Sequence, residues 1–134
     1  MKYRATLLLV VVLLIPTIGS ANDLGACQKI FALSQSALSN KAKGVSKEKL
    51  VSALPSKQSG NEPEPLRSMR EIVGEVYSHQ IINQFAYSVY RTELCVLREA
   101  GQAPSVEFEK ILPELNSCSV EDPECAMQLA GSKL

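Results

Sequence analysis

Histidine is nearly absent from this 134-residue sequence, and its four cysteines are widely spaced. His79 is the only histidine, and no two cysteines lie two to four residues apart. Structural zinc sites usually need such closely spaced ligand pairs, so we expect no metal and no other cofactor. Glycine-rich phosphate loops and recognisable nucleophile motifs are also missing. These absences give no support to an enzyme, although catalytic groups can also come together only in the folded chain.

An excess of positive charge is missing as well. The chain has 14 basic and 14 acidic residues, and without residues 1–21, which contain Lys2 and Arg4, it has 12 and 14. Proteins that bind nucleic acid usually carry a net positive charge, so we expect no nucleic-acid partner. The charge is unevenly distributed: residues 22–60 contain six lysines but only Asp23 and Glu48, whereas residues 61–134 contain six basic and twelve acidic groups.

Residues 1–21 have the pattern of a secretory signal peptide. Lys2 and Arg4 precede an apolar run of nine residues from Leu7 to Ile15, and Gly19-Ser20-Ala21 offers small residues for cleavage after Ala21. A membrane anchor is the alternative interpretation, but a bilayer span needs about 20 apolar residues. We therefore expect a periplasmic or secreted protein that begins near Asn22 and has no stable membrane span.

Apolar residues in the rest of the chain recur at steps of three and four, which predicts an all-α protein. No alternating stretch is long enough to require a strand. We expect a small disulfide-tied bundle of about four to six helices. The first expected helix runs from Leu24 to a stop at Gly44, the second from the N-cap Ser46 to about Ala53, and the third along the apolar stripe from Leu66 to Tyr77. The fourth runs from about Gln84 to Ala100. The fifth starts at Ser105 and is interrupted at Pro113, and the last runs from Asp122-Pro123-Glu124 to about Gly131.

Residues 55–65 contain three prolines and one glycine but no large apolar side chain, which predicts a loop. Neither side of this loop is long enough to fold alone, so residues 22–134 should form a single helical domain. Residues 101–134 form a C-terminal extension of that domain. A chain of this length buries roughly two thirds of its unfolded surface, which is enough for a modest core.

Four cysteines in an exported chain indicate two disulfides, for which three pairings can be drawn. We favour Cys118 with Cys125, because only six residues separate them and the bridge can close a local turn, and Cys27 with Cys95. One feature conflicts with the second pair. The broad apolar face of residues 84–100 leaves Leu94 and especially Cys95 pointing away from its centre. Either this helix is packed on two sides, or the favoured pairing is wrong.

The first half of the chain also carries a recognisable pattern. Cys27 and its helix are followed by Gly44-Val45-Ser46, by Ile72-Val73 and Val76-Tyr77, and by an aromatic-rich helix that closes on Cys95. This pattern, over residues 27–95, resembles a group of small exported bacterial proteins of uncharacterised function. The resemblance implies a compact all-helical domain tied by a Cys27–Cys95 bridge and brings no catalytic residue. The group usually ends near the position of Cys95, so it does not account for residues 101–134.

Glu71, Glu75 and His79 are the best candidates for chemistry. Their spacing of four stacks them along one side of the predicted third helix. Such a strip could bind a metal or act as an acid and a base, with His79 titrating near neutral pH. A solvated polar face opposite the apolar stripe is the simpler interpretation, and we expect no catalytic residue.

Tyr87 and Arg91 are the candidates for contacting a partner. Both residue types are enriched at interaction hot spots, and Tyr87 is expected off the apolar face of its helix and therefore exposed. A second candidate is an acidic region around Lys110 that could dock a basic partner, made of Glu99, Glu107, Glu109, Glu114, Glu121, Asp122 and Glu124.

We therefore expect a non-catalytic helical protein that binds an unidentified protein partner, as inhibitors and immunity proteins do. One alternative is a periplasmic stress chaperone that exposes apolar surface when its carboxylates become protonated in acid. The other is a small hydrolase that uses Glu71, Glu75 and His79.

Overall fold

The computed structural model describes residues 24–57, 60–102, 104 and 107–132, and in this part of the chain it contains six α-helices and no strand. The predicted all-α class is confirmed. The predicted signal peptide, residues 1–21, and the predicted helix start at Ser105 lie outside the described residues. The helices are α1 (Leu24–Ala42), α2 (Lys47–Ala53), α3 (Glu64–Ser78), α4 (Gln84–Glu99), α5 (Phe108–Ser117) and α6 (Pro123–Ala130).

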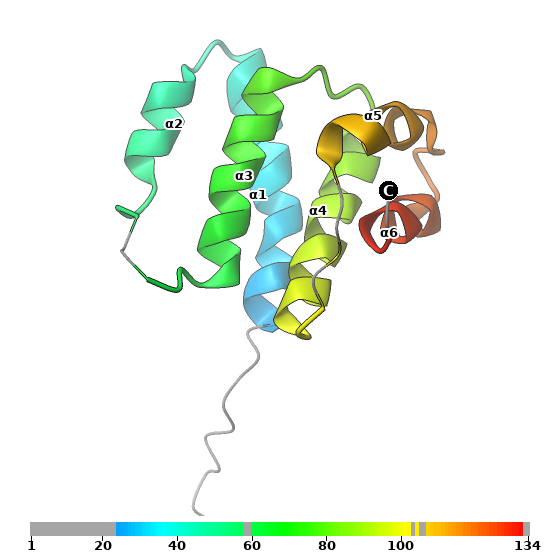
Figure 1. Cartoon of the computed structure of the whole chain (residues 1–134). Coiled ribbons are helices and arrows are strands. Elements are labelled where there is room, and N and C mark those ends of the chain that lie inside the picture. Colours follow the sequence, from blue (N-terminus) through cyan, green and yellow to red (C-terminus); the bar gives the residue numbers. More distant parts are fainter. Residues whose placement is uncertain (1–23, 58–59, 103, 105–106, 133–134) are drawn as a thin grey trace, which may run out of the picture.

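Helix α4 lies at the centre of the bundle (Figure 1). Helix α1 packs along α4 in the antiparallel direction, and α3 contacts both of them. Helices α5 and α6 cover another side of α4, whereas α2 lies on the outer side of α3. The hydrophobic core draws buried side chains from α1, α3, α4, α5 and α6, and α2 buries no residue. No helix in the described residues is both long enough and apolar enough to cross a bilayer.

Contacts on several sides of α4 resolve the conflict over Cys95. The expected apolar face, from Phe85 to Leu97, is only partly right: Ala86 is buried, but Phe85, Val89, Val96 and Leu97 are half-buried. The other buried residues of α4 are Tyr87, Ser88, Tyr90, Arg91, Leu94 and Cys95. The simple face assignment fails because a central helix has neighbours around most of its circumference and does not need one apolar stripe. Both favoured disulfides are present, Cys27–Cys95 and Cys118–Cys125, with Cα–Cα distances of 5.6 and 5.9 Å.

The ends of the helices follow the predicted signals closely. Gly44 stops α1 with a φ of +79°, a conformation that costs glycine little, and Val45 N–H donates to Asn40 O in the same turn. Ser46 caps α2 by accepting from Lys49 N–H, and Asn83 caps α4 by accepting from Ala86 N–H. Asp122 caps α6 in the predicted manner, with Pro123 as the first helical residue.

Two local expectations are wrong. Helix α3 begins at Glu64, so Glu64 and Pro65 belong to this helix and not to the predicted loop; proline fits because the first turn of a helix needs no N–H donor there. Pro113 lies inside α5 and does not interrupt it. Pro113 is exposed and forfeits only the single hydrogen bond to the carbonyl of Glu109, which the short helix tolerates.

Hydrogen bonds fasten the C-terminal helices to the rest of the bundle. The side chain of Asn116 accepts from the N–H groups of Ile82 and Asn83, at 3.0 and 3.3 Å. The side chain of Asn83 in turn donates to Cys118 O at 2.6 Å. The Cys118–Cys125 bridge therefore joins α5 and α6 at the place where both meet the turn before α4.

We expect the two disulfides to stabilise the fold unequally. In the chain-entropy treatment, the bridge across 68 residues contributes about 4 kcal/mol and the bridge across 7 residues about 2 kcal/mol. Replacing Cys27 and Cys95 together by alanine should therefore lower the free energy of unfolding about twice as much as replacing Cys118 and Cys125. Urea denaturation of the two double variants measures both losses, and equal losses would contradict this account.

Candidate functional site

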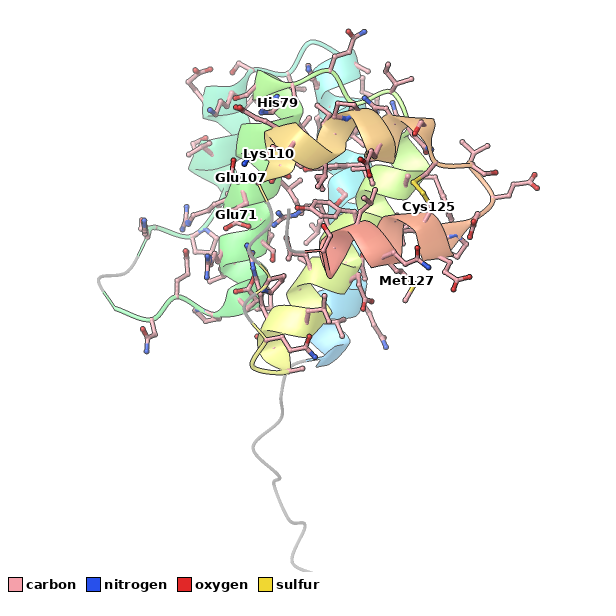
Figure 2. All side chains as sticks on the ribbon, turned by 45° about the vertical axis from the view of Figure 1, so that its right-hand side comes forward. Glu71, His79, Glu107, Lys110, Cys125 and Met127 are labelled. Carbon is pink, nitrogen blue, oxygen red and sulfur yellow. A yellow bond between two sulfur atoms is a disulfide. The ribbon has the colours of Figure 1, made fainter. Side chains whose placement is uncertain are left out.

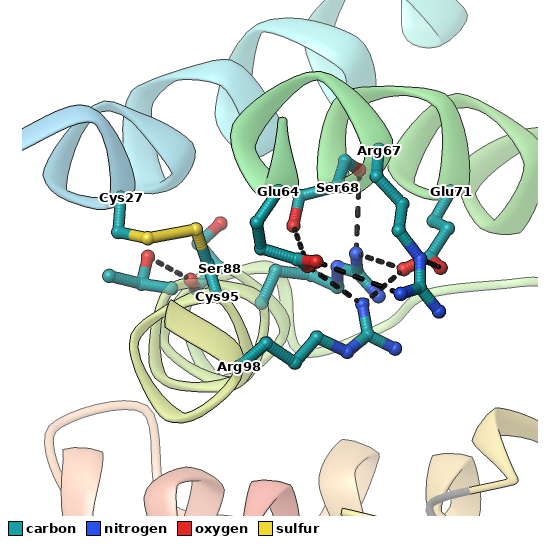
Figure 3. The surroundings of a disulfide bond; sticks show 10 residues. Cys27, Glu64, Arg67, Ser68, Glu71, Ser88, Cys95 and Arg98 are labelled. Atoms are coloured by element: carbon teal, nitrogen blue, oxygen red, sulfur yellow. Dashed lines mark hydrogen bonds and ion pairs between the residues drawn. A yellow bond between two sulfur atoms is a disulfide. The ribbon is translucent and has the colours of Figure 1, made fainter. Parts of the chain in front are cut away.

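The polar side chains of α3 and α4 form an ion cluster that lies between these two helices (Figure 3). We use the name arginine cluster for Glu64, Arg67, Glu71, Glu75, Arg91 and Arg98, which carry three positive and three negative charges. The glutamates stand seven and four residues apart on α3, and Arg91 and Arg98 stand seven apart on α4. Because α3 and α4 are antiparallel, this spacing places Glu64 beside Arg98 and Glu75 beside Arg91.

Arg91 is the centre of the arginine cluster and is only 1% exposed. Its guanidinium donates to Glu71 Oε2 at 2.7 Å and to Glu75 Oε1 at 3.2 Å. Tyr87 Oη donates to the other oxygen of Glu75 at 2.8 Å, and Arg98 bridges Glu71 and Glu64 at 2.8 and 3.1 Å. Arg91 Nε is buried and has no acceptor. A buried arginine in contact with two carboxylates holds α3 and α4 in one register. A shift in register would leave a buried charge without its partner, which would cost free energy of folding.

Opposing effects set the protonation of the two buried carboxyl groups. Burial acts to raise the pKa of Glu71, but Arg91 and Arg98 outweigh it and lower that pKa from 4.5 to about 2. Burial raises the pKa of Glu75 above 4.5 even though Arg91 and Tyr87 favour the ionised form. The neighbouring charge of Glu71 adds to this rise. Burial also raises the pKa of Tyr90 to about 12, so its hydroxyl is neutral at ordinary pH.

The strip of Glu71, Glu75 and His79 does not assemble as a reactive site. Glu71 and Glu75 converge on Arg91, whereas His79 lies at the end of α3 beside α5 (Figure 2). The His79 ring makes an edge contact with Phe108, and its Nε2 lies 4.0 Å from Glu109 Oε1. No group of three or more His, Cys, Asp or Glu in the described residues is placed to hold a metal ion. The two carboxylates already have cationic partners inside the fold, so they are not free to serve as base or nucleophile.

The expectation that Tyr87 and Arg91 form an exposed contact surface is wrong. Tyr87 is 0% exposed because Phe108 of α5 packs against its ring at a centroid distance of 5.7 Å. Phe108 also covers Tyr90 at 5.9 Å. The helix periodicity of α4 could not reveal this burial, because Phe108 comes from a different helix.

Six members of the predicted acidic region face solvent on α5 and its N-cap, on α6 and in the turn between them: Glu107, Glu109, Glu114, Glu121, Asp122 and Glu124. The seventh, Glu99, is half-buried at the end of α4. Lys110 pairs with Glu107 at 3.0 Å. Exposed ion pairs of this kind contribute little to stability.

An apolar groove between α1, α2 and α3 is the other distinctive feature of the structure. Its volume is about 190 Å³. Helix α1 supplies two polar residues at its edge, Ser36 and Asn40. The remaining lining is apolar and comes from all three helices: Leu33, Ala37, Leu50, Ala53, Leu54, Met69, Ile72 and Val73. The sequence signal for the wall formed by α2 was the spacing of Leu50, Ala53 and Leu54, which share one face of a short helix.

Helix α2 forms one wall of this groove but is attached mainly at its two ends. Before the helix, Tyr77 Oη donates to Val45 O; after it, the guanidinium of Arg70 donates to Pro55 O and also pairs with Glu62 at 2.7 Å. None of the residues of α2 is buried. The helix itself is therefore held with few buried contacts.

The opposite pKa shifts of Glu71 and Glu75 give a test of the arginine cluster. Ionised Glu71 stabilises the folded state at neutral pH, and this contribution is lost as pH falls from about 4.5 to about 2. We expect it to amount to about 1–2 kcal/mol after allowance for the partial exposure of Glu71. Glu71→Gln should therefore flatten the acid decline of the free energy of unfolding, measured by urea denaturation at pH values from 7 to 2.

Glu75→Gln is the matched control on the same helix and the same arginine. The raised pKa of Glu75 means that its contribution to stability is greatest at low pH and falls as pH rises through that pKa. This variant should therefore keep the decline between pH 4.5 and 2. If both variants show the wild-type decline, Glu71 is not the group responsible.

The arginine cluster and the apolar groove must be interpreted from their own geometry. No protein-family model, no curated protein and no solved structure matches this chain.

Proposed function

We propose that this chain is a non-catalytic binding protein that holds apolar side chains of a protein partner in the groove between α1, α2 and α3. The groove carries the proposal, because it is an apolar hollow with a wall, α2, that buries no residue of its own. Buried apolar surface is the main favourable term in protein association, and an unfilled apolar hollow at the surface is a site where that term can be gained.

The size of the groove favours side chains over a small-molecule ligand. Pockets for drug-sized ligands and cofactors usually measure about 300–1,000 Å³ and enclose most of the ligand. The groove measures about 190 Å³, which suits one or two large side chains of a partner. An amphipathic helix placed in a groove presents side chains at such spacing.

The distribution of polar groups also favours binding over catalysis. The carboxylates that contact the buried Arg91, Glu71 and Glu75, are used to join α3 to α4. The groove lining contains Ser36 and Asn40 as its only polar residues, and neither contacts an acid or base within it. Such a site can orient a partner but offers no group to activate water.

The proposal places the working protein outside the cytosol. Two disulfides are typical of proteins that fold in an oxidising compartment. Residues 1–21 supply the predicted signal for export. A periplasmic or secreted inhibitor or immunity-like protein combines these properties.

Filling the groove should abolish partner binding. Ala53 lines the groove and Val51 lies on the outer face of the same helix, so Ala53→Trp and Val51→Trp form a matched pair. The partner would be isolated from the source cells with tagged full-length protein and then titrated, purified, by calorimetry. We expect Ala53→Trp to weaken binding at least tenfold, equivalent to about 1.4 kcal/mol, and Val51→Trp to have no effect.

Ser36→Trp fills the same groove from α1 and checks that any effect does not come from α2 alone. Circular dichroism of all three variants verifies that they are folded. Wild-type affinity in both groove variants would rule out the groove as the binding site.

Export should remove residues 1–21. We expect the intact mass of the protein recovered from the periplasm or medium of a bacterial host to correspond to a chain that begins at Asn22. Val11→Arg places a charge in the apolar run and should leave the precursor in the cytosol. A protein that keeps residues 1–21 after reaching the periplasm would contradict the predicted cleavage.

An acid-activated chaperone is the second candidate function, and the low pKa of Glu71 is the observation that favours it. Glu71 keeps its charge in the fold until the pH approaches about 2. The stability that its contact with Arg91 provides is therefore lost between about pH 4.5 and 2, which favours separation of α3 from α4 in acid. A chaperone of this kind would bind a hydrophobic dye at pH 2 but not at pH 7, whereas a rigid binding protein would bind it at neither.

A further inference from the structure

Three lysines extend the residue pattern that lines the apolar groove. On α1, Lys29 stands one turn before Leu33, and Lys43 follows Asn40 by three residues, just beyond the end of α1 at Ala42. On α2, Lys49 stands one turn before Ala53. All three lysines are exposed and make no ion pair with a carboxylate of the described residues.

The segment that contains α1 and α2 is strongly positive, whereas Arg70 of α3 is paired with Glu62. Residues 24–57 contain six lysines and a single acid, Glu48. Glu48 lies on the outer face of α2 with Lys47 and Val51, and it is not among the groove-lining residues. An occupant with acidic groups therefore gains favourable interactions at both ends of the groove, and an occupant with basic groups is repelled.

We propose that the occupant of the groove is an acidic amphipathic helix of a partner protein. This inference rests on the proposed function, because it assumes that the groove is the binding site. Lys29 on α1 and Lys43 just beyond its end are 14 residues apart, which corresponds to about 21 Å at the rise of an α-helix. A partner helix of about four turns spans that length, inserts large apolar side chains between α1 and α2, and places carboxylates near the lysines.

The contribution of the lysines to binding affinity is expected to be modest and to depend on salt. Exposed ion pairs are individually weak and are screened by salt. Three such pairs together should make an acidic helix bind about tenfold tighter than a neutral helix with the same apolar face. The preference should shrink markedly between 20 mM and 500 mM salt.

Three synthetic helices provide the probes. They have about 18 residues and the same leucine face, and their other positions carry glutamate, glutamine or lysine. Fluorescence anisotropy measures their affinities for the full chain, and Ala53→Trp tests that they occupy the groove. We expect the affinity to fall from the glutamate helix to the glutamine helix to the lysine helix.

Lys49→Glu and Lys57→Glu form the matched pair that isolates the groove charge. Both substitutions change the net charge equally, but Lys57 lines a separate hollow with Gly60 and Asn61 and does not line the groove. Lys49→Glu should weaken the glutamate helix several-fold and Lys57→Glu should not. The triple reversal of Lys29, Lys43 and Lys49 to glutamate should make the lysine helix the tightest of the three.

The outcomes separate this inference from the proposed function. If all three helices bind equally and Ala53→Trp abolishes binding, the groove is a docking site and the acidic preference is wrong. If no helix binds, or if Ala53→Trp leaves binding unchanged, both proposals fail. If the chain forms dimers by sedimentation that Lys49→Glu disrupts, or if dodecanoate binds and no helix does, the occupant is a second copy or a lipid and the inference is overturned.

Discussion

The burial of Arg91 is the constraint on which the rest of the structure depends. A guanidinium that is 1% exposed must have its charge balanced on the spot, and Glu71 and Glu75 provide this balance from the neighbouring helix. Only one register of α3 against α4 satisfies both contacts. The Cys27–Cys95 bridge then fixes α1 on another side of the same helix (Figure 3). Helix α4 is thus tied covalently on one side and electrostatically on another.

The groove follows from this arrangement. Helices α1 and α3 run in the same direction beside α4, so the chain between them must return along the outside of the bundle (Figure 1). Helix α2 makes this return, and it has too few apolar residues to be drawn into the core. Tyr77 and Arg70 hold the chain at both ends of α2, leaving a hollow lined by Leu33, Met69 and Ile72. The hollow is therefore a consequence of how two parallel helices are connected.

Local signals in the sequence predicted most of the fold, but they did not predict the arginine cluster or the groove. Caps such as Ser46, Asn83 and Asp122 act within one turn, so their effect is readable from neighbouring residues. The exposed status of Tyr87 was predicted wrongly because Phe108, its cover, is distant in sequence. The arginine cluster had a signal that went unused: glutamates and arginines seven residues apart on consecutive helices. The groove had no sequence signal of comparable strength. A hollow forms where the side chains of three helices leave space between them, and no single segment encodes that space.

The polar and apolar groups of this fold are placed differently from those of a typical enzyme active site. In most active sites, acids and bases line a pocket where their pKa values are tuned for proton transfer. Here the tuned carboxyl groups of Glu71 and Glu75 are inside the fold and bound to Arg91, while the pocket is lined almost entirely by apolar side chains. The perturbed pKa values thus report on how α3 and α4 are joined, and the surface hollow is the place where we propose that a partner binds. Ion pairs hold the two long helices together, whereas α2, the wall of the groove, buries no residue of its own.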